Sequence, residues 1–180
     1  MYSVAVMVGS LRAQSINRKL AQAVGKLAEG RLDFRFVEIG DLPLYNDDLW
    51  ASPPAAVLKF KEEVAACDAA LFVTPEFNRG VPAALTNAFD WGSRPYGQGV
   101  WAGKPGAIMG TSPGAISTAV AQSTFRNQML VLGMAVMGQP ELYVQSKPGL
   151  FDTGEITDEG FKGLMNGFVD KYVAWIAKFV

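Results

Sequence analysis

Histidine is absent from the 180 residues of this chain, and cysteine occurs once, as Cys67. Without histidine, the sequence excludes a Ser-His-Asp triad, histidine acid–base chemistry and the usual zinc sites. A single cysteine excludes an intramolecular disulfide and a cysteine-rich metal site, so we expect no metal. We interpret Cys67 as a structural thiol, because no neighbouring residue would lower its pKa. An enzyme of this composition would take its reactive group from a cofactor.

An excess of charge and long apolar runs are lacking as well. The 16 Lys and Arg against 17 Asp and Glu give a net charge of −1, which argues against nucleic acid or an anionic membrane as a partner. The longest apolar stretch, residues 129–137, contains Gly133 and is too short to cross a bilayer. The first ten residues lack a basic leader and a cleavage region, and they read as a strand. We therefore expect a cytoplasmic protein without membrane segments.

The sequence does contain a regular alternation of short apolar runs and helically spaced apolar residues. Hydrophobic residues make up 49% of the chain, enough for one core in a single domain spanning residues 1–180. Strand and helix alternate five times, which predicts an α/β, three-layer, doubly wound sheet of five parallel strands. The expected strands are 3–8, 32–39 (at or near a sheet edge), 69–73, 106–110 and a last strand region made of 134–137 and 141–144, interrupted by Gly138 and Pro140. The expected helices are 16–27, 55–67, a segment from residue 82, 117–132 and 157–178.

The segment VGSLRAQSIN, residues 8–17, joins the first apolar run to the first helical pattern. It concentrates hydroxyl, amide and guanidinium donors where free N–H groups of a helix start carry partial positive charge. These donors predict a binding site for a phosphate dianion. Helix capping by Ser15 or Asn17 is the alternative, but capping does not account for Arg12. The segment fits neither the G-x-G-x-x-G nor the G-x-x-x-x-G-K-[ST] pattern, which argues against the usual dinucleotide and nucleoside-triphosphate loops.

Two further polar loops, residues 74–80 and 111–114, also follow buried strands. Ligands of doubly wound sheets collect beyond the carboxyl ends of the strands, so we expect the three loops to meet there. Three such loops at one edge are a more specific signal than any one of them. The loop 41–54 is rich in apolar residues, including Leu44 and Trp50, and is a candidate cover for the site or contact for a partner chain.

With these loops the chain resembles the NADPH-dependent FMN reductase family, the flavodoxin-like group that includes bacterial quinone and chromate reductases. The resemblance covers nearly the whole chain and rests on residues 9–17 (GSLRAQSIN), 74–78 (TPEFN), 81–85 (VPAAL), 87–91 (NAFDW), 103–105 (GKP) and 111–112 (TS). It implies a flavodoxin-like sheet with strand order 2-1-3-4-5 and one FMN-binding domain. The second motif departs from the commoner PEYN followed by tyrosine and serine, because Phe77 replaces a tyrosine and Arg79-Gly80 follows Asn78.

The resemblance implies FMN as the cofactor and NADPH or NADH as the co-substrate. One set of residues would hold the FMN phosphate, together with nearby backbone amides: Ser10, Leu11, Arg12, Ser15, Ile16 and Asn17. A second set would line the isoalloxazine ring, largely through the main chain: Pro75, Glu76, Phe77 and Asn78. A third set would contact the flavin from the loop after the fourth strand: Thr111 and Ser112. Arg79 and Arg94 are candidate contacts for an anionic group of a substrate, with solvated loop arginines as the alternative.

The reaction implied by the resemblance needs no catalytic side chain. Hydride passes from NAD(P)H to N5 of the flavin, and a quinone, free flavin, chromate or azo compound then takes electrons at the same face, in a ping-pong sequence. The family also implies a homodimer or homotetramer. Two alternatives stay open. One is a flavodoxin-type FMN electron carrier without NAD(P)H:acceptor activity, which the near-neutral charge and Arg12 disfavour. The other is a flavin-independent partner-binding domain on the same sheet.

Overall fold

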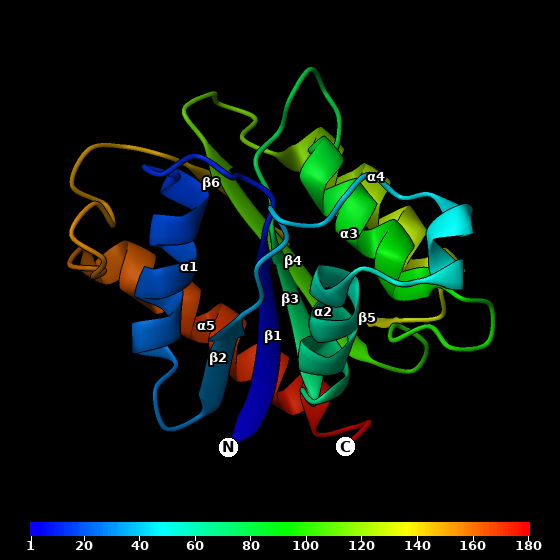
Figure 1. Cartoon of the computed structure of the whole chain (residues 1–180). Helices are drawn as coiled ribbons and strands as arrows, with labels where there is room; N and C mark the ends of the chain where they lie inside the picture. Colours follow the sequence, from blue (N-terminus) through cyan, green and yellow to red (C-terminus); the bar gives the residue numbers. More distant parts are fainter.

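Six parallel strands form the centre of the computed structural model, which describes residues 1–180 (Figure 1). Five α-helices and one short 3₁₀ helix connect them or follow them. The strands are β1 (Tyr2–Val8), β2 (Leu32–Phe36), β3 (Ala69–Val73), β4 (Pro105–Ser112), β5 (Ala135–Val136) and β6 (Leu142–Gln145). The helices are α1 (Ile16–Leu27), α2 (Ala55–Ala65), α3 (Ala83–Ser93), α4 (Ala119–Val131), α5 (Glu159–Ile176) and the 3₁₀ helix η1 (Asp47–Ala51).

The strand order β2-β1-β3-β4-β5 confirms the predicted doubly wound topology, with β2 at an edge. The expected interruption of the last strand region is confirmed, and its two pieces pair separately: β5 with the start of β4 and β6 with its end. Gly138 and Pro140 lie between these two short strands, and a proline has no N–H to donate to a ladder. The second strand is shorter than expected and ends at Phe36, although Val37 still donates from its backbone N–H to Val6.

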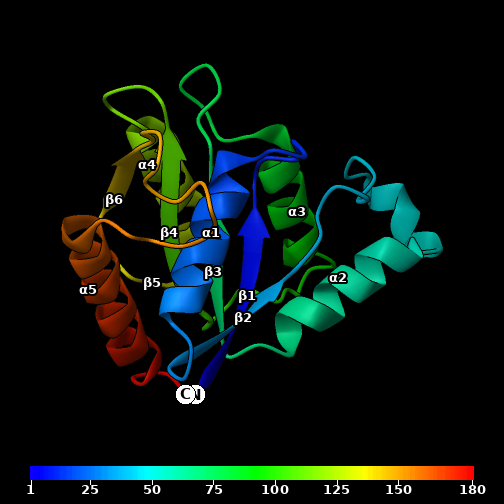
Figure 2. The same cartoon turned by 90° about the vertical axis from the view of Figure 1, so that its left-hand side faces the viewer.

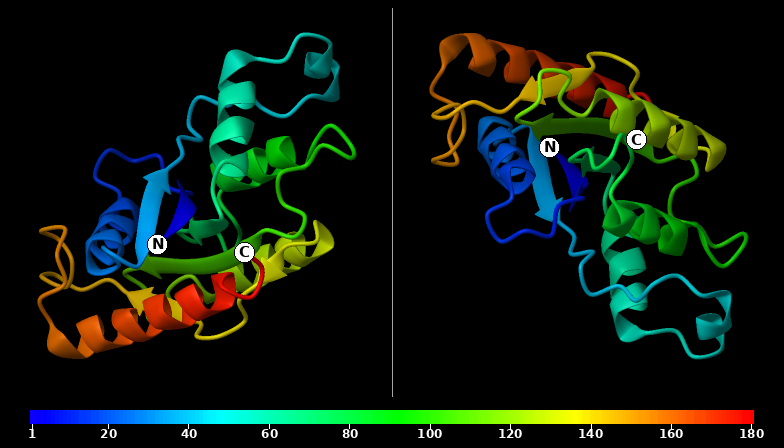
Figure 3. Two further views of the ribbon diagram at one scale, coloured as in Figure 1. Left: turned by 90° about the horizontal axis from the view of Figure 1, so that it is seen from below. Right: turned by 90° about the horizontal axis from the view of Figure 1, so that it is seen from above.

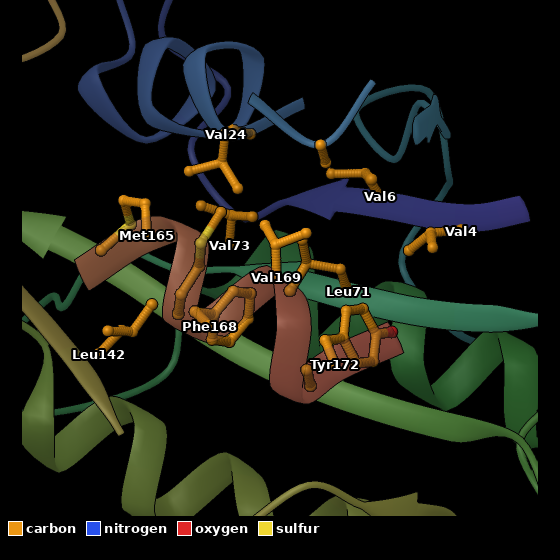
Figure 4. Close-up of a cluster of buried hydrophobic side chains, with 14 of the residues drawn as sticks. Val4, Val6, Val24, Leu71, Val73, Leu142, Met165, Phe168, Val169 and Tyr172 are labelled. Atoms are coloured by element: carbon orange, nitrogen blue, oxygen red, sulfur yellow. The ribbon is translucent and has the colours of Figure 1, made fainter. Parts of the chain in front are cut away.

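Helices cover both faces of the sheet, as the views along the strands show (Figure 3). Alternate residues of β1 supply two separate cores, with Val4 and Val6 on one face and Ala5 and Met7 on the other. The first core lies between the sheet and the helices α1 and α5. There, valines and leucines of the sheet meet Phe168 and other side chains of α5 (Figure 4). The second core lies under α2, α3 and α4 and is rich in aromatic rings.

The apolar loop 41–54 is fastened to α3 by the residues of the NAFDW motif. Asn87 accepts from the N–H of Tyr45 at 2.8 Å and donates to the carbonyl of Pro43 at 2.9 Å. The indole N–H of Trp91 donates to the same carbonyl at 2.8 Å, and the ring of Trp50 packs edge-on against Trp91. Most of the apolar surface of this loop is therefore used within the chain, whereas Leu44 stays 82% exposed.

Both termini lie at the edge of the sheet where the strands begin (Figures 1 and 2). Cys67 is buried at this edge, and burial raises the pKa of its thiol. No helix has the length and apolarity that a membrane-spanning segment requires. The three polar loops gather at the opposite edge, where β1, β3 and β4 end.

Candidate functional site

The three predicted loops meet beyond the carboxyl ends of β1, β3 and β4, in the upper part of Figure 1. They enclose a hollow of about 130 Å³. Its lining residues are Ser10, Arg12, Ser15, Ile16, Asn17, Pro75, Glu76, Phe77, Thr111, Ser112 and Pro113. Two of the predicted residues do not line it: Leu11, which is 58% exposed, and Asn78, which lines a neighbouring hollow. Pro113 was not among the predicted residues.

The first loop leaves most of its backbone donors free. The N–H groups of residues 10–14, 16 and 17 make no hydrogen bond within the chain. Ser15 caps α1 by accepting from the N–H of Arg18 at 3.2 Å, and its own hydroxyl proton remains available to donate. Capping and anion binding are therefore compatible at Ser15. Such free donors at a helix start, beside the guanidinium of Arg12, suit a dianion.

The side chain of Asn17 joins two of the loops that line the hollow. Its amide Nδ2 donates to the carbonyl of Thr111, and its Oδ1 accepts from the N–H of Thr111, both at 3.0 Å. The side chain is 1% exposed and joins the first loop to the end of β4. Asn17 thus offers the hollow its free backbone N–H, while its side chain fixes the distance between two walls. Beside it, the hydroxyl oxygen of Thr111 is buried without a partner.

The second loop is a tight two-residue hairpin turn. Phe77 and Gly80 exchange backbone hydrogen bonds of 3.2 and 2.9 Å around Asn78 and Arg79. Both central residues are left-handed, with φ of 52° and 61°. Asparagine tolerates this conformation, whereas an arginine there costs about 1 kcal/mol relative to glycine. Such strain at a site edge is typical of functional loops.

The side chain of Glu76 is buried and binds other parts of the protein. Its Oε2 accepts from the N–H groups of Val120 and Ala121 at the start of α4, both at 3.0 Å. Its Oε1 accepts from Nη1 of Arg79 at 2.9 Å, and the side chain is only 5% exposed. Burial raises the pKa of this carboxyl, but the hydrogen bonds and the charge of Arg79 outweigh burial and hold the pKa below its usual value.

A second hollow of about 440 Å³ adjoins the first, because both are lined by Glu76 and Ser112. The rest of its lining is Asn78, Arg79 and residues 114–117. Residues 115–117 were not among the predicted site residues, because the expected loop ended at Gly114 and the expected helix began at Ser117. In the structure, Ser117 is left-handed with φ 51° and donates from its hydroxyl to the carbonyl of Val144. The helix therefore starts two residues later than expected, at Ala119.

Arg94 does not meet the three loops within one chain. It follows the last residue of α3, the end remote from the loop that precedes this helix. There it lines a separate hollow of about 370 Å³ between α3 and α4, together with Asp90 and Gln128.

The residues at the three loops fit FMN. The free N–H groups and hydroxyls match a phosphate, and the one carboxylate in the lining, that of Glu76, is already bound to donors of the protein. Gly9 permits close packing of the loops, because a Cβ there would lie 3.2 Å from Pro82 and 3.3 Å from Pro75. The orphaned hydroxyl of Thr111 offers a further polar contact to a ligand.

Comparison with known proteins agrees with this geometry. The model of the NADPH-dependent FMN reductase family matches residues 2–149. A quinone reductase of Pseudomonas putida is 49% identical over 97% of this chain and 95% of its own length. A 2-hydroxy-1,4-benzoquinone reductase of Burkholderia sp is 48% identical, over 96% and 95%. The structure of FerB, a flavoenzyme NAD(P)H:(acceptor) oxidoreductase of Paracoccus denitrificans, is 50% identical with a TM-score of 0.96, covering 99% of both chains.

A flavodoxin of Pseudomonas aeruginosa is 17% identical with a TM-score of 0.60, which shows a shared fold alone. The electron-carrier alternative is therefore not favoured, and the predictions of fold, FMN cofactor and NAD(P)H-dependent oxidoreductase are confirmed. Because the family model matches residues 2–149, this chain belongs to the NADPH-dependent FMN reductase family.

Proposed function

We propose that this chain passes reducing equivalents from NAD(P)H to quinones at the site formed by its three loops. The observation that carries the proposal is the row of unpaired N–H groups at residues 10–14, 16 and 17, in a loop that lines one hollow with Thr111, whose buried hydroxyl has no partner. The names of relatives at 48–49% identity support quinones as the acceptor class. Free flavin, chromate and azo compounds are further candidate acceptors.

The first loop would hold the phosphate of FMN, through its free N–H groups and the side chains of Ser10, Arg12 and Ser15, with Leu11 and Ile16 contributing main chain. The ring would lie against the backbone of Pro75–Asn78 and against Thr111 and Ser112. When bound, FMN supplies the hydride-accepting and electron-donating group that the side chains of this chain lack. The contribution of the protein is to hold that group and to orient both substrates against it. The whole chain, residues 1–180, would act as one FMN-binding domain.

The second hollow is our candidate for the place where substrates enter. Arg79 lies on its lining, and its side chain is 64% exposed although one nitrogen is held by Glu76. It has donors left for an anionic group, such as a phosphate of the nicotinamide cofactor or a quinone oxyanion. Because the chain has no separate dinucleotide motif, NAD(P)H and the quinone would use one site in turn. Double-displacement kinetics are the expected result.

The assembly we propose is a homodimer or homotetramer. Val131 is 84% exposed and Leu130 is 60% exposed on α4, and the buried Oε1 of Gln128 nearby has no partner within the chain. These residues adjoin the hollow that contains Arg94, so this face is our candidate for the subunit contact. By contrast, Arg126 is paired with Glu141 of the same chain at 3.1 Å and needs no second subunit.

Anaerobic spectroscopy of the FMN-reconstituted protein tests the proposed function. We expect NADPH to bleach the flavin absorbance and a stoichiometric amount of 1,4-benzoquinone to restore it. A bound flavin that NADPH does not bleach would indicate an electron carrier. A protein that stays colourless after reconstitution would contradict the site itself and favour a partner-binding domain.

A further inference from the structure

We propose that Glu76 is a positioning residue that holds the loop after β3 against the start of α4 and thereby sets the width of the ring site. The proposal rests on the proposed function, because it concerns the same FMN site. Glu76 acts here through its side chain, in addition to the main-chain contact with the ring that its position implies.

The first argument is that Glu76 joins parts of the chain that are far apart in sequence. Its Oε2 receives two hydrogen bonds of 3.0 Å from Val120 and Ala121, which are 44 and 45 residues away. These N–H groups belong to the first turn of α4 and have no acceptor inside the helix. A carboxylate at a helix N-terminus also gains from the helix dipole. The contact is therefore favourable both for the carboxylate and for the two N–H groups of the helix.

The second argument is that the loop has no other fastening of this kind. The loop between β3 and α3 stands above the sheet (Figures 1 and 2). Within residues 75–80, hydrogen bonds run between Phe77 and Gly80 and between Glu76 and Arg79, and Thr74 next to the loop donates to Pro75. The bonds to α4 are the only ones that connect this segment to a distant part of the chain.

The third argument concerns the two walls that the contact joins. Glu76 lines both hollows, and residues 112–117, which lead into α4, form the wall opposite the second loop. The other oxygen of Glu76 holds Arg79, whose backbone is left-handed. One buried carboxylate therefore fixes the opposite wall and the turn at the same time. Without it, no hydrogen bond would join residues 75–80 to this wall.

Two substitutions separate the effect of losing the hydrogen-bond acceptor of Glu76 from other effects of replacing this residue. Glu76→Gln keeps an oxygen that accepts from Val120 and Ala121, whereas Glu76→Ala removes the acceptor. We expect Glu76→Ala to weaken FMN binding about tenfold or more, because two buried donors lose their acceptor and the ring wall is freed. We expect Glu76→Gln to stay within about threefold of the original affinity, because the bond to the helix survives. Glu29→Gln, an exposed change at the other edge of the sheet, is the matched control.

The experiment measures the dissociation constant of FMN by fluorescence quenching and the amide hydrogen exchange of Val120 and Ala121 in the FMN-bound protein. Faster exchange and weaker binding in Glu76→Ala, with both restored in Glu76→Gln, support the proposal. Wild-type affinity or wild-type exchange in Glu76→Ala overturns it, and so does a Gln variant that is as impaired as the Ala variant. Quinone reduction is assayed separately. A wild-type protein that binds FMN but reduces no quinone contradicts the proposed function without changing the result for Glu76.

Discussion

Polar groups differ between the two ends of the sheet. They are paired at the amino edge, where the strands begin, and many are unpaired at the carboxyl edge, where the strands end. At the amino edge, Asp68 accepts from the N–H and the hydroxyl of Ser3 at 2.7 and 2.8 Å, and its own N–H donates back to Ser3 at 3.1 Å. Lys104 donates to the carbonyl of Cys67 nearby. At the carboxyl edge, the N–H groups of residues 10–14, 16 and 17 have no partner in the protein, and the hydroxyl of Thr111 is buried alone.

The difference separates the groups that stabilise the fold from those that bind a ligand. Satisfied polar groups at the amino edge contribute to the free energy of unfolding, because removing one partner leaves the other unpaired. The buried hydroxyl of Thr111 lowers stability while it has no partner, whereas the N–H groups of the exposed residues 11–14 bond water until a ligand accepts from them. Substitutions at the amino edge should therefore change stability alone, and those at the carboxyl edge should change FMN affinity.

The largest effect is expected where one residue serves both purposes. In Asn17→Asp, a carboxylate can no longer donate to the carbonyl of Thr111, and it places a negative charge beside the phosphate site. We expect FMN affinity to fall about 100-fold or more, with a loss of about 2 kcal/mol in unfolding free energy. Titration with FMN and urea unfolding of the apoprotein measure the two. Gln22→Glu on the exposed face of α1, which also adds a negative charge, is the control. An unchanged FMN affinity in Asn17→Asp would refute the role of the Asn17–Thr111 hydrogen bonds in FMN binding.

Arg12→Ala should weaken FMN binding without changing the stability of the apoprotein. Arg12 is exposed and makes no side-chain hydrogen bond within the chain, so the apoprotein should keep its thermal midpoint. Loss of a charge-assisted contact to the phosphate should weaken FMN binding about 10- to 100-fold. Isothermal titration and thermal unfolding of the apoprotein check both parts. A drop in the midpoint without a change in FMN affinity would reverse our assignment, and Arg35→Ala on β2 is the matched control.

Asp68 offers the corresponding test at the amino edge through pH. Backbone hydrogen bonding from Ser3 is the main cause that lowers the pKa of Asp68. A carboxyl with a lowered pKa in the folded state stabilises fully above its unfolded pKa of about 4, and this contribution is lost as pH falls through the folded value. Asp68→Asn should therefore cost about 1 kcal/mol at pH 7 and progressively less below pH 4, with FMN affinity unchanged at pH 7. Urea unfolding across this pH range measures it; a constant difference would count against the mechanism.

The smallest effect is expected for Thr111→Val, where apoprotein stability and FMN affinity should change in opposite directions. Valine keeps the shape and removes a buried hydroxyl that has no partner, so the apoprotein should gain up to about 1 kcal/mol. FMN binding should weaken about threefold to tenfold, because a ligand contact is lost. Unfolding of the apoprotein and titration with FMN give the two signs. If stability and affinity changed in the same direction, the hydroxyl of Thr111 would not be a group that is unpaired in the apoprotein and contacts FMN when it is bound.

The sequence was enough to predict the parts of the fold that follow from local patterns. Fully apolar runs such as 69–73 predicted buried parallel strands, and the donors of residues 9–17 predicted an anion site at the first strand end. Contacts across long separations were not predictable in this way. The amide of Asn17 bonds to Thr111, 94 residues away, and Glu76 bonds to α4, so neither pairing leaves a local pattern. Gly138 and Pro140 did predict the interruption between β5 and β6, but not that the two pieces pair with different segments of β4.

The most direct test of the account compares FMN with riboflavin, which differs from FMN only by lacking the phosphate. Both are titrated into the same apoprotein at fixed ionic strength, and the two dissociation constants are measured by flavin fluorescence. We expect FMN to bind about 100-fold more tightly or better, because the free N–H groups of the first loop and Arg12 act on the phosphate. Equal affinities for FMN and riboflavin would contradict the assignment of that loop.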